Sequence, residues 1–219
     1  MREVGLRYCF VVEPQDKEKY ASFGATTLTL PENDMGITYS RNFILNHCRK
    51  IGYQFFWMLD DDIENFGEVI NGKTVKTNAE VLCKAFNQMG KFEFSMASLE
   101  LRQFAWSSKE LTQNRTAMQC VLFNVKNCKD IDYDLNILIR EDYDMTFQAI
   151  TKGFGTLKTA KYYYGIADMK SQEGGMSQWY NEEREKKEVE KLCKKWGALV
   201  EPEFKKNRHD VKINWRKLK

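Results

Sequence analysis

An apolar and aromatic run at residues 53–59, YQFFWML, stops abruptly at three consecutive aspartates, Asp60, Asp61 and Asp62. A segment that is apolar on both faces is typical of a central strand in a parallel or mixed sheet. In open α/β sheets, ligands bind outside the carboxyl ends of the strands. The junction therefore predicts a buried central strand whose end presents three carboxylates at a ligand site.

The patterns on either side of this strand alternate between strand and helix, which favours an α/β fold. The segment 40–52 has apolar residues at helical spacing, with Ser40 as the expected N-cap and Gly52 as the C-terminal stop. We expect further helices at 78–89, 141–152 and 179–196, and strands at 6–12, 25–30, 92–99, 118–125, 161–166 and 211–215.

Composition and length narrow the class of protein. The chain has 219 residues, of which 42% are hydrophobic and 30% charged, with only 3 Pro, so a disordered or fibrous chain is excluded. No apolar run approaches the roughly 20 residues that a membrane helix needs, and the first residues do not resemble a signal peptide. We therefore expect a single domain, 1–219, cytoplasmic and without membrane contact, in which a mixed sheet is flanked by helices and followed by a basic C-terminal extension.

The acidic triplet is the first candidate site. Along an extended chain Asp60 and Asp62 point to the same side, and two such carboxylates suit Mg²⁺ or Mn²⁺. The chain has only two histidines and no C-x-x-C pair among its 6 cysteines, so oxygen atoms must supply most ligands of any metal. The alternative is an acidic turn that caps a following helix.

Two later motifs could complete the site. Glu141 and Asp142 begin an expected helix, where a carboxylate could act as general base or could simply interact with the helix dipole. Gly174 and Gly175 could let backbone N–H groups approach a phosphate, or could form an ordinary loop.

The order of these features resembles the GT-A nucleotide-sugar glycosyltransferases. Their pattern is an (A/S)RN helix, present here as Ser40-Arg41-Asn42, then a D-x-D metal motif and a downstream E-D motif. Within that group, the block GITYSRNFILNHCRKIGYQFFWMLDDDIENF, the GG turn and Asn214-Trp215 most resemble the TET/JBP-associated enzymes, implied in glycosylating hydroxymethylated pyrimidines in DNA of phages and eukaryotes.

The resemblance assigns roles to individual residues. Residues 1–100 would form the donor-nucleotide half, 101–178 the acceptor half, and 179–219 a C-terminal helix and basic tail. Asp142, with Glu141 beside it, would activate the acceptor if the enzyme inverts the anomeric centre. The metal would be held by Asp60 and Asp62, with His209 or Asp168 as a third ligand, and the UDP-sugar would be bound by Glu13, Arg41, Asp60, Asp61, Gly174 and Gly175.

Charge is uneven along the chain and bears on the acceptor. The net charge is +3, yet residues 205–219 carry seven basic residues and one acid. Together with the polar loop 107–116 beside Trp106, this tail could contact DNA, or it could be a solvated terminus. A protein or glycan acceptor, a metal-dependent nuclease or phosphohydrolase, and a non-catalytic binding protein remain the alternative functions. His209 could also be a solvated surface residue, and His47 in mid-helix is expected to be structural.

Overall fold

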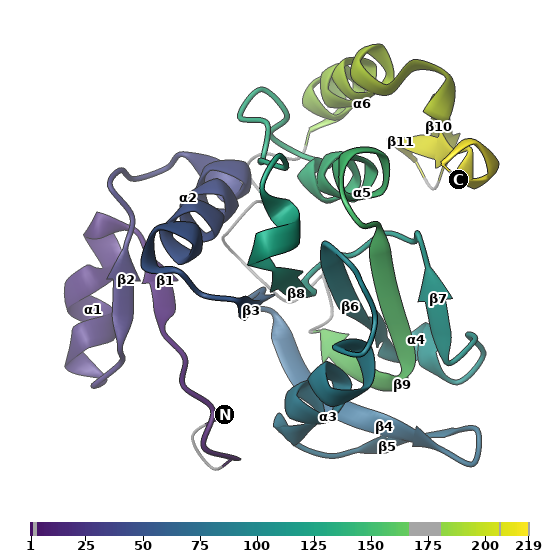
Figure 1. The fold of residues 1–219 in the computed structure, drawn as a ribbon. Coiled ribbons are helices and arrows are strands. Elements are labelled where there is room, and N and C mark those ends of the chain that lie inside the picture. Colours follow the sequence, from purple (N-terminus) through teal and green to yellow (C-terminus); the bar gives the residue numbers. More distant parts are fainter. Residues whose placement is uncertain (2–3, 167–180, 206, 219) are drawn as a thin grey trace.

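The structure is a computed structural model that describes residues 1, 4–166, 181–205 and 207–218. Its main sheet contains β3, β8, β6, β9, β4 and β5 in that order, with β7 paired to the edge of β9 (Figure 1). The bounds of these strands are β3 Phe55–Leu59, β4 Ile63–Ile70, β5 Lys73–Lys76, β6 Met96–Leu101, β7 Leu111–Gln113, β8 Cys120–Asn124 and β9 Thr156–Ile166.

The sheet is mixed, as the sequence predicts. β6 and β9 are parallel, whereas β8 is antiparallel to both β3 and β6. β3, β6 and β9 therefore run in the same direction, and their carboxyl ends lie on one edge of the sheet. That edge carries the residues that follow β3, namely Asp60, Asp61 and Asp62.

Helices cover both faces of the sheet. On one face, α3 (Glu80–Met89) contributes Val81, Leu82, Ala85 and Met89 to a core cluster. On the other face, α2 (Gly36–Ile51) and α5 (Glu141–Lys152) contribute Leu45, Met145 and Ala149. The expected α/β class is confirmed.

The expectation that 53–59 is a central strand is wrong, because β3 ends the sheet and pairs only with β8 among the described strands. Its apolar character has another cause. Phe55 and Trp57 pack against the α3 cluster, whereas Phe56 and Met58 pack against the α2 and α5 cluster. Both faces of this end strand are therefore packed, although only Met58 of its residues is fully buried.

Two details of the first 52 residues also differ from the expectations. Only Phe10–Val12 of the segment 6–12 forms a strand, β1, and it pairs in parallel with β2 (Thr27–Thr29) as a separate two-stranded sheet. Gly52 ends α2, as expected. The helix begins at Gly36, however, so Ser40 lies inside it and does not cap it. The helix starts earlier because Gly36 adopts φ 80° at the turn and the Thr38 hydroxyl donates to the Ile137 carbonyl over 2.7 Å.

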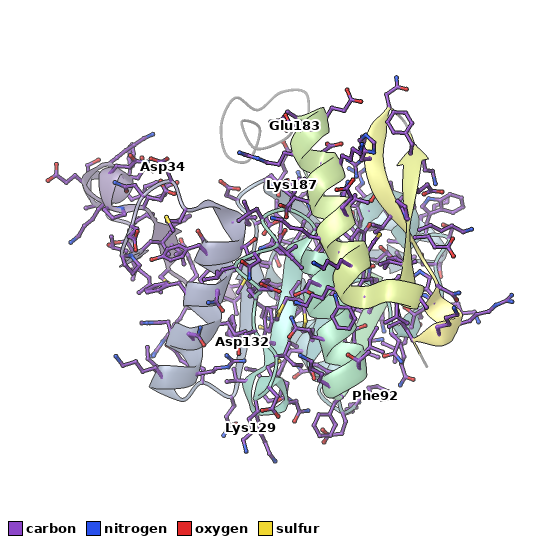
Figure 2. All side chains as sticks on the ribbon, turned by 90° about the horizontal axis from the view of Figure 1, so that it is seen from above. Asp34, Phe92, Lys129, Asp132, Glu183 and Lys187 are labelled. Carbon is purple, nitrogen blue, oxygen red and sulfur yellow. The ribbon has the colours of Figure 1, made fainter. Side chains whose placement is uncertain are left out.

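The C-terminal part forms a unit that the sequence predicts only in part. α6 (Glu182–Trp196) lies beside a hairpin of β10 (Val200–Lys205) and β11 (Arg208–Ile213), as Figures 1 and 2 show. A helix over 179–196 and a final strand at 211–215 were expected, but β10 was not. The sequence also predicts a plain loop at 107–116, but β7 lies within it. The remaining short elements are α1 Lys17–Ser22, α4 Arg102–Ala105, and 3-10 turns at Pro14–Asp16, Val125–Cys128, Gly197–Leu199 and Trp215–Lys217.

Two findings bear on the predictions from composition. All six cysteines are free thiols: Cys48, Cys120 and Cys128 are buried, Cys193 is half-buried, and Cys9 and Cys83 are exposed. Among the described residues, no helix is long and apolar enough to cross a membrane.

Candidate active site

Arg41 joins two acidic motifs that lie far apart in the sequence. Its Nη2 donates to Oδ1 and Oδ2 of Asp60 over 2.6 and 2.8 Å, and its Nη1 donates to Oε1 of Glu141 over 2.5 Å. The guanidinium is buried, and the two carboxylates raise the pKa of Arg41 further above its usual value, although burial opposes them. The structure therefore brings the D-x-D and E-D motifs together around one permanent cation.

A small pocket opens beside this ion-pair network. It is lined by Arg41, Met58, Asp60, Ala117, Gln119, Val121, Tyr133 and Asp142. These residues come from α2, β3 and the turn after it, β8 and the segment before it, the loop before α5, and the start of α5. The pocket therefore sits where several elements meet at the acidic edge of the sheet. Its position is the one that the acidic triplet predicts for a ligand site.

The paired acids at the start of α5 have different environments. Glu141 is 7% exposed and is engaged by Arg41, whereas the side chain of Asp142 lines the pocket and accepts from the backbone N–H of Tyr143, over 2.9 Å. Burial raises the pKa of Glu141 to about 7 and also raises the pKa of Asp142, while Arg41 opposes both shifts. Asp142 is thus the acid that a bound molecule could reach, and Glu141 is the acid that holds Arg41.

One oxygen atom of Asp62 lacks a hydrogen-bond partner within the described residues. This atom, Oδ1, is buried, and Oδ2 receives a long hydrogen bond of 3.4 Å from Nε2 of Gln119. Burial and then the charges of Asp60 and Asp61 raise the pKa of Asp62. A divalent cation would supply the missing partner and relieve the repulsion, so the donor set fits Mg²⁺ or Mn²⁺.

Two protein carboxylates are all that the described part of the chain offers to such an ion. No group of three or more His, Cys, Asp or Glu residues is arranged there to hold a metal. Mg²⁺ usually keeps several waters and binds through one or two carboxylates plus phosphate oxygens. The pair of Asp60 and Asp62 therefore fits an ion that is shared with a diphosphate better than an ion enclosed by protein.

Gln119 is a residue of the site that the sequence analysis misses. It adopts φ 59°, a left-handed conformation that costs a non-glycine residue about 1–2 kcal/mol. Its carbonyl accepts from the N–H of Asp60 over 2.8 Å, and its side chain bridges the Tyr164 hydroxyl, at 3.1 Å, and Asp62. Gln119 thus orients the acidic turn, and no sequence motif marks it.

A second missed feature is an ion pair between Glu100, next to the end of β6, and Lys158 on β9, which are 3.6 Å apart. Burial lowers the pKa of Lys158, and the charge of Glu100 and, more weakly, that of Asp142 oppose this shift. The pair joins β6 to β9, and single residues within strands gave no signal in the sequence that would have selected it.

Other residues that the sequence singles out do not line this pocket or fall outside the described residues. Glu13 follows β1 and accepts from the N–H of Asp34 and from Gln15, so it holds the segment that leads to α2. Asp61 is exposed. His209 lies on β11, with its ring against Phe204 and its Nε2 3.9 Å from Glu182. Gly174, Gly175 and Asp168 fall in 167–180, outside the described residues.

A mixed sheet covered by helices, with paired acids gathered at its carboxyl edge, defines a GT-A-like glycosyltransferase fold. The fold is similar to that of the crystal structure of S. aureus TarS 1–349, with a TM-score of 0.50 and 16% identity over 72% of this chain and 50% of that chain. A second structure, of the same TarS segment in complex with UDP, gives a TM-score of 0.47 and 14% identity over 72% and 51%. The chain spans about half the length of these structures.

The chain belongs to the TET-Associated Glycosyltransferase family, whose model matches residues 2–175. No curated protein matches the chain in sequence. The match to the family confirms the resemblance on which the residue assignments rest, and it covers Arg41, the acidic triplet and the paired acids of α5 in one alignment.

Proposed function

We propose that the protein is a metal-dependent glycosyltransferase that moves a sugar from a UDP-sugar to the hydroxyl of 5-hydroxymethylcytosine in DNA. The observation that carries this proposal is the arrangement of Asp60, Arg41 and Glu141 beside a pocket that Asp142 lines. Family membership supplies the reaction class.

The donor would bind at the acidic edge. Asp60 and Asp62 would hold Mn²⁺ or Mg²⁺, which would neutralise charge on the leaving diphosphate. Arg41 keeps Asp60 in a fixed orientation through two hydrogen bonds, and the Gln119 carbonyl fixes the Asp60 backbone. The nucleotide would lie toward Glu13 at the end of β1, and Gly174 and Gly175 are proposed to cover the diphosphate.

Asp142 is the proposed general base. Its carboxylate lines the pocket and would take the proton of the acceptor hydroxyl as that oxygen attacks the anomeric carbon. A well-placed base contributes roughly 10²–10⁴-fold in rate. Glu141 cannot take this role easily, because it is buried and paired with Arg41, so its proposed task is to hold the network together.

The acceptor side is supported by charge and exposed aromatic rings. Phe104 and Trp106 are 52% and 61% exposed in and after α4, which follows the carboxyl end of β6. The guanidinium of Arg115 lies 5.2 Å over the ring of Trp215, and this contact connects the 107–116 segment to the basic C-terminal residues. Cationic side chains position a nucleic acid, and aromatic rings stack on an extruded base.

The metal-dependent nuclease is less well supported. A two-metal site needs further carboxylates close to Asp60 and Asp62, and Glu141 is instead paired with Arg41. Within the described residues, no cluster of three such ligands exists. A nuclease mechanism would also give the Arg41 network no function.

The test is transfer itself. Duplex DNA with 5-hydroxymethylcytosine is incubated with the protein, Mn²⁺ and a panel of UDP-sugars. The DNA is then digested, and the masses of its nucleosides are measured by mass spectrometry. The proposal predicts a pentose or hexose increment on hydroxymethylcytosine, none on cytosine, and none after chelation of the metal. Transfer to a protein or glycan but not to DNA would overturn the acceptor assignment, and strand cleavage without any sugar would favour the nuclease.

A further inference from the structure

We infer that the C-terminal unit, defined as α6 with the β10–β11 hairpin, is a positioning element of the active site that acts through Arg140. The family model ends at residue 175, before this unit begins. The inference rests on the proposed function, because it concerns the orientation of the base Asp142 and of its neighbour Glu141.

Arg140 is the residue immediately before the paired acids, and its backbone is strained. It is the N-cap of α5 and adopts φ 76°, in the left-handed region that non-glycine residues rarely occupy. Such strain persists only where the surroundings over-determine the conformation. The direction in which Glu141 and Asp142 leave the chain therefore depends on what holds Arg140.

The hairpin holds Arg140. The side chain of Arg140 is 8% exposed, and its Nη2 donates to the backbone carbonyl of His209. Its Nη1 lies 3.5 Å from Oδ1 of Asp210. Both partners belong to β11, so the hairpin contacts the residue that directly precedes Glu141 and Asp142.

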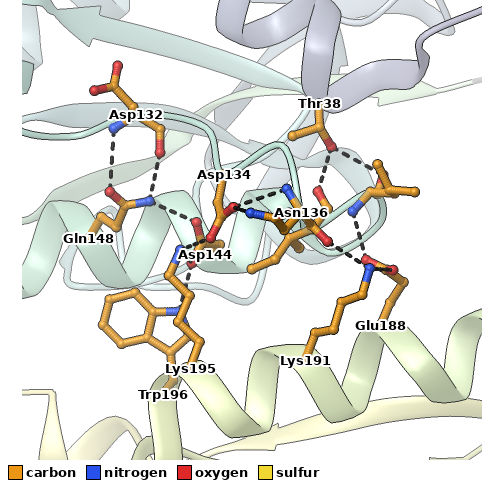
Figure 3. Close-up of polar contacts among 12 residues, drawn as sticks. Thr38, Asp132, Asp134, Asn136, Asp144, Gln148, Glu188, Lys191, Lys195 and Trp196 are labelled. Atoms are coloured by element: carbon orange, nitrogen blue, oxygen red, sulfur yellow. Dashed lines mark hydrogen bonds and ion pairs between the residues drawn. The ribbon is translucent and has the colours of Figure 1, made fainter.

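α6 fixes the surrounding segment independently (Figure 3). Oε2 of the buried Glu188 accepts from the N–H of Leu138 over 2.7 Å, and Lys191 donates to the Asn136 carbonyl over 2.7 Å. Asp144, in the first turn of α5, receives Nε1 of Trp196 and Nζ of Lys195, each at 2.8 Å. The loop before α5 and its first turn are thus tied to the same unit.

An apolar contact supports these polar ones. Phe147 of α5 and Ile137 pack in one cluster with residues of all three C-terminal elements, namely Val189, Leu192, Val200 and Val211. The C-terminal unit therefore cannot shift without moving the start of α5. A misplacement of about 1 Å at a reacting group can cost about 100-fold in rate.

The test compares Asp210→Asn and Arg140→Gly with a matched control on the same hairpin, Glu201→Gln, whose side chain is exposed. Asp210→Asn removes the charge partner of Arg140. Arg140→Gly removes the guanidinium but accepts the positive φ, so the helix start can still form. Hydrogen exchange of the backbone amides at 141–146, kcat, the donor KM and Tm are measured for all four proteins.

We expect both test variants to exchange these amides about 10-fold faster than wild type and to lose about 10- to 100-fold in kcat, with the donor KM within about twofold. The control should match wild type in every measurement. Unchanged exchange in both variants would overturn the inference, as would a loss of kcat that merely follows a loss of Tm and donor binding. If wild type transfers no sugar, the proposed function fails, and the exchange rates alone still decide whether the unit holds α5.

Discussion

Arg41 and Glu141 stand 100 positions apart in the chain, and Nη1 of the arginine donates to Oε1 of the glutamate over 2.5 Å. The same guanidinium holds both oxygens of Asp60. One side chain on α2 therefore sets the relative positions of the acidic turn after β3 and the acids that open α5.

Replacement of Arg41 tests the network as a structural element. Arg41→Met leaves Glu141 and Asp60 without their cation, and removal of one partner of a buried pair costs about 3–5 kcal/mol of unfolding free energy. Chemical denaturation at pH 8 measures this loss. Lys50→Met, which removes an exposed cation of the same helix, should change the free energy by less than about 0.5 kcal/mol. Equal effects of the two substitutions would contradict the structure.

Stability should also depend on pH through Glu141. Its pKa is about 7 in the folded protein against 4.5 for an ordinary glutamate, because burial outweighs the attraction of Arg41, and the charges of Asp142 and Asp60 add to the rise. The folded state thus holds a proton that the unfolded state has lost. The stabilising contribution is complete below about pH 4.5 and is lost as the pH rises through about 7.

The measurement is the free energy of unfolding of wild type minus that of Glu141→Gln, at pH 5 and pH 8. This difference should be smaller at pH 8, because only wild type loses a proton at position 141. A difference that grows from pH 5 to pH 8 would show that the pKa of Glu141 lies below its ordinary value.

Asp142 should contribute to turnover, whereas Glu141 should contribute to the Arg41 network. Asp142→Asn removes the base but leaves the Arg41 network intact, so turnover should fall roughly 10²–10⁴-fold with UDP affinity retained. Asp130→Asn, an exposed acid outside the site, is the control. Transfer kinetics and calorimetry provide the two readouts. Near wild-type turnover in Asp142→Asn would remove its role as base and favour a retaining mechanism.

The strain at Gln119 predicts opposite effects on stability and on binding. Gln119→Gly relaxes φ 59°, so stability should be unchanged or higher by about 1 kcal/mol. The same change removes the amide that contacts Asp62, and such supporting contacts are worth about 10–100-fold in metal affinity. Asn71→Gly, at φ 51° in the exposed turn between β4 and β5, relaxes a similar backbone and should leave metal affinity unchanged.

The proposed DNA contact predicts a change in salt dependence. Arg216→Gln with Lys217→Gln removes two exposed cations beside Trp215, and each lost phosphate contact should reduce the slope of log K against log salt by about 0.9. The control pair is Lys126→Gln with Lys129→Gln. In Figure 2, Lys129 lies at the lower edge of the view, whereas the C-terminal hairpin lies at the upper right. Equal slopes for the two double variants would argue against the C-terminal contact.

The sequence predicts well those features that local patterns encode. α5 spans 141–152 as expected, and Gly52 ends α2 in the left-handed conformation that its lack of a side chain allows. The acidic turn lies at the carboxyl edge of the sheet because it directly follows β3. The pairing of Asp60 with Arg41 was not predictable from the residues alone, since it depends on how α2 crosses the sheet.

Features that depend on tertiary contacts could not be predicted. β3 looks like a central strand because both of its faces are packed, although it ends the sheet. Gln119 belongs to the site through its left-handed backbone, which no side-chain pattern encodes for a glutamine. Arg140 likewise owes its strained conformation to the hairpin. There the backbone carbonyl of His209, 69 residues away, accepts a hydrogen bond from its guanidinium.

The most direct test of the account is a calorimetric titration of UDP into the protein with and without Mn²⁺. Asp62 is the residue to change, because its Oδ1 has no hydrogen-bond partner in the described part of the chain and because Asp62 is not one of the residues that Arg41 holds. Wild type and the exposed neighbour variant Glu64→Gln should bind UDP with Mn²⁺ and bind it poorly without, and Asp62→Ala should lose the metal-dependent binding. Equal Mn²⁺-dependent binding in Asp62→Ala would contradict the claim that the acidic turn holds the metal and, through it, the donor.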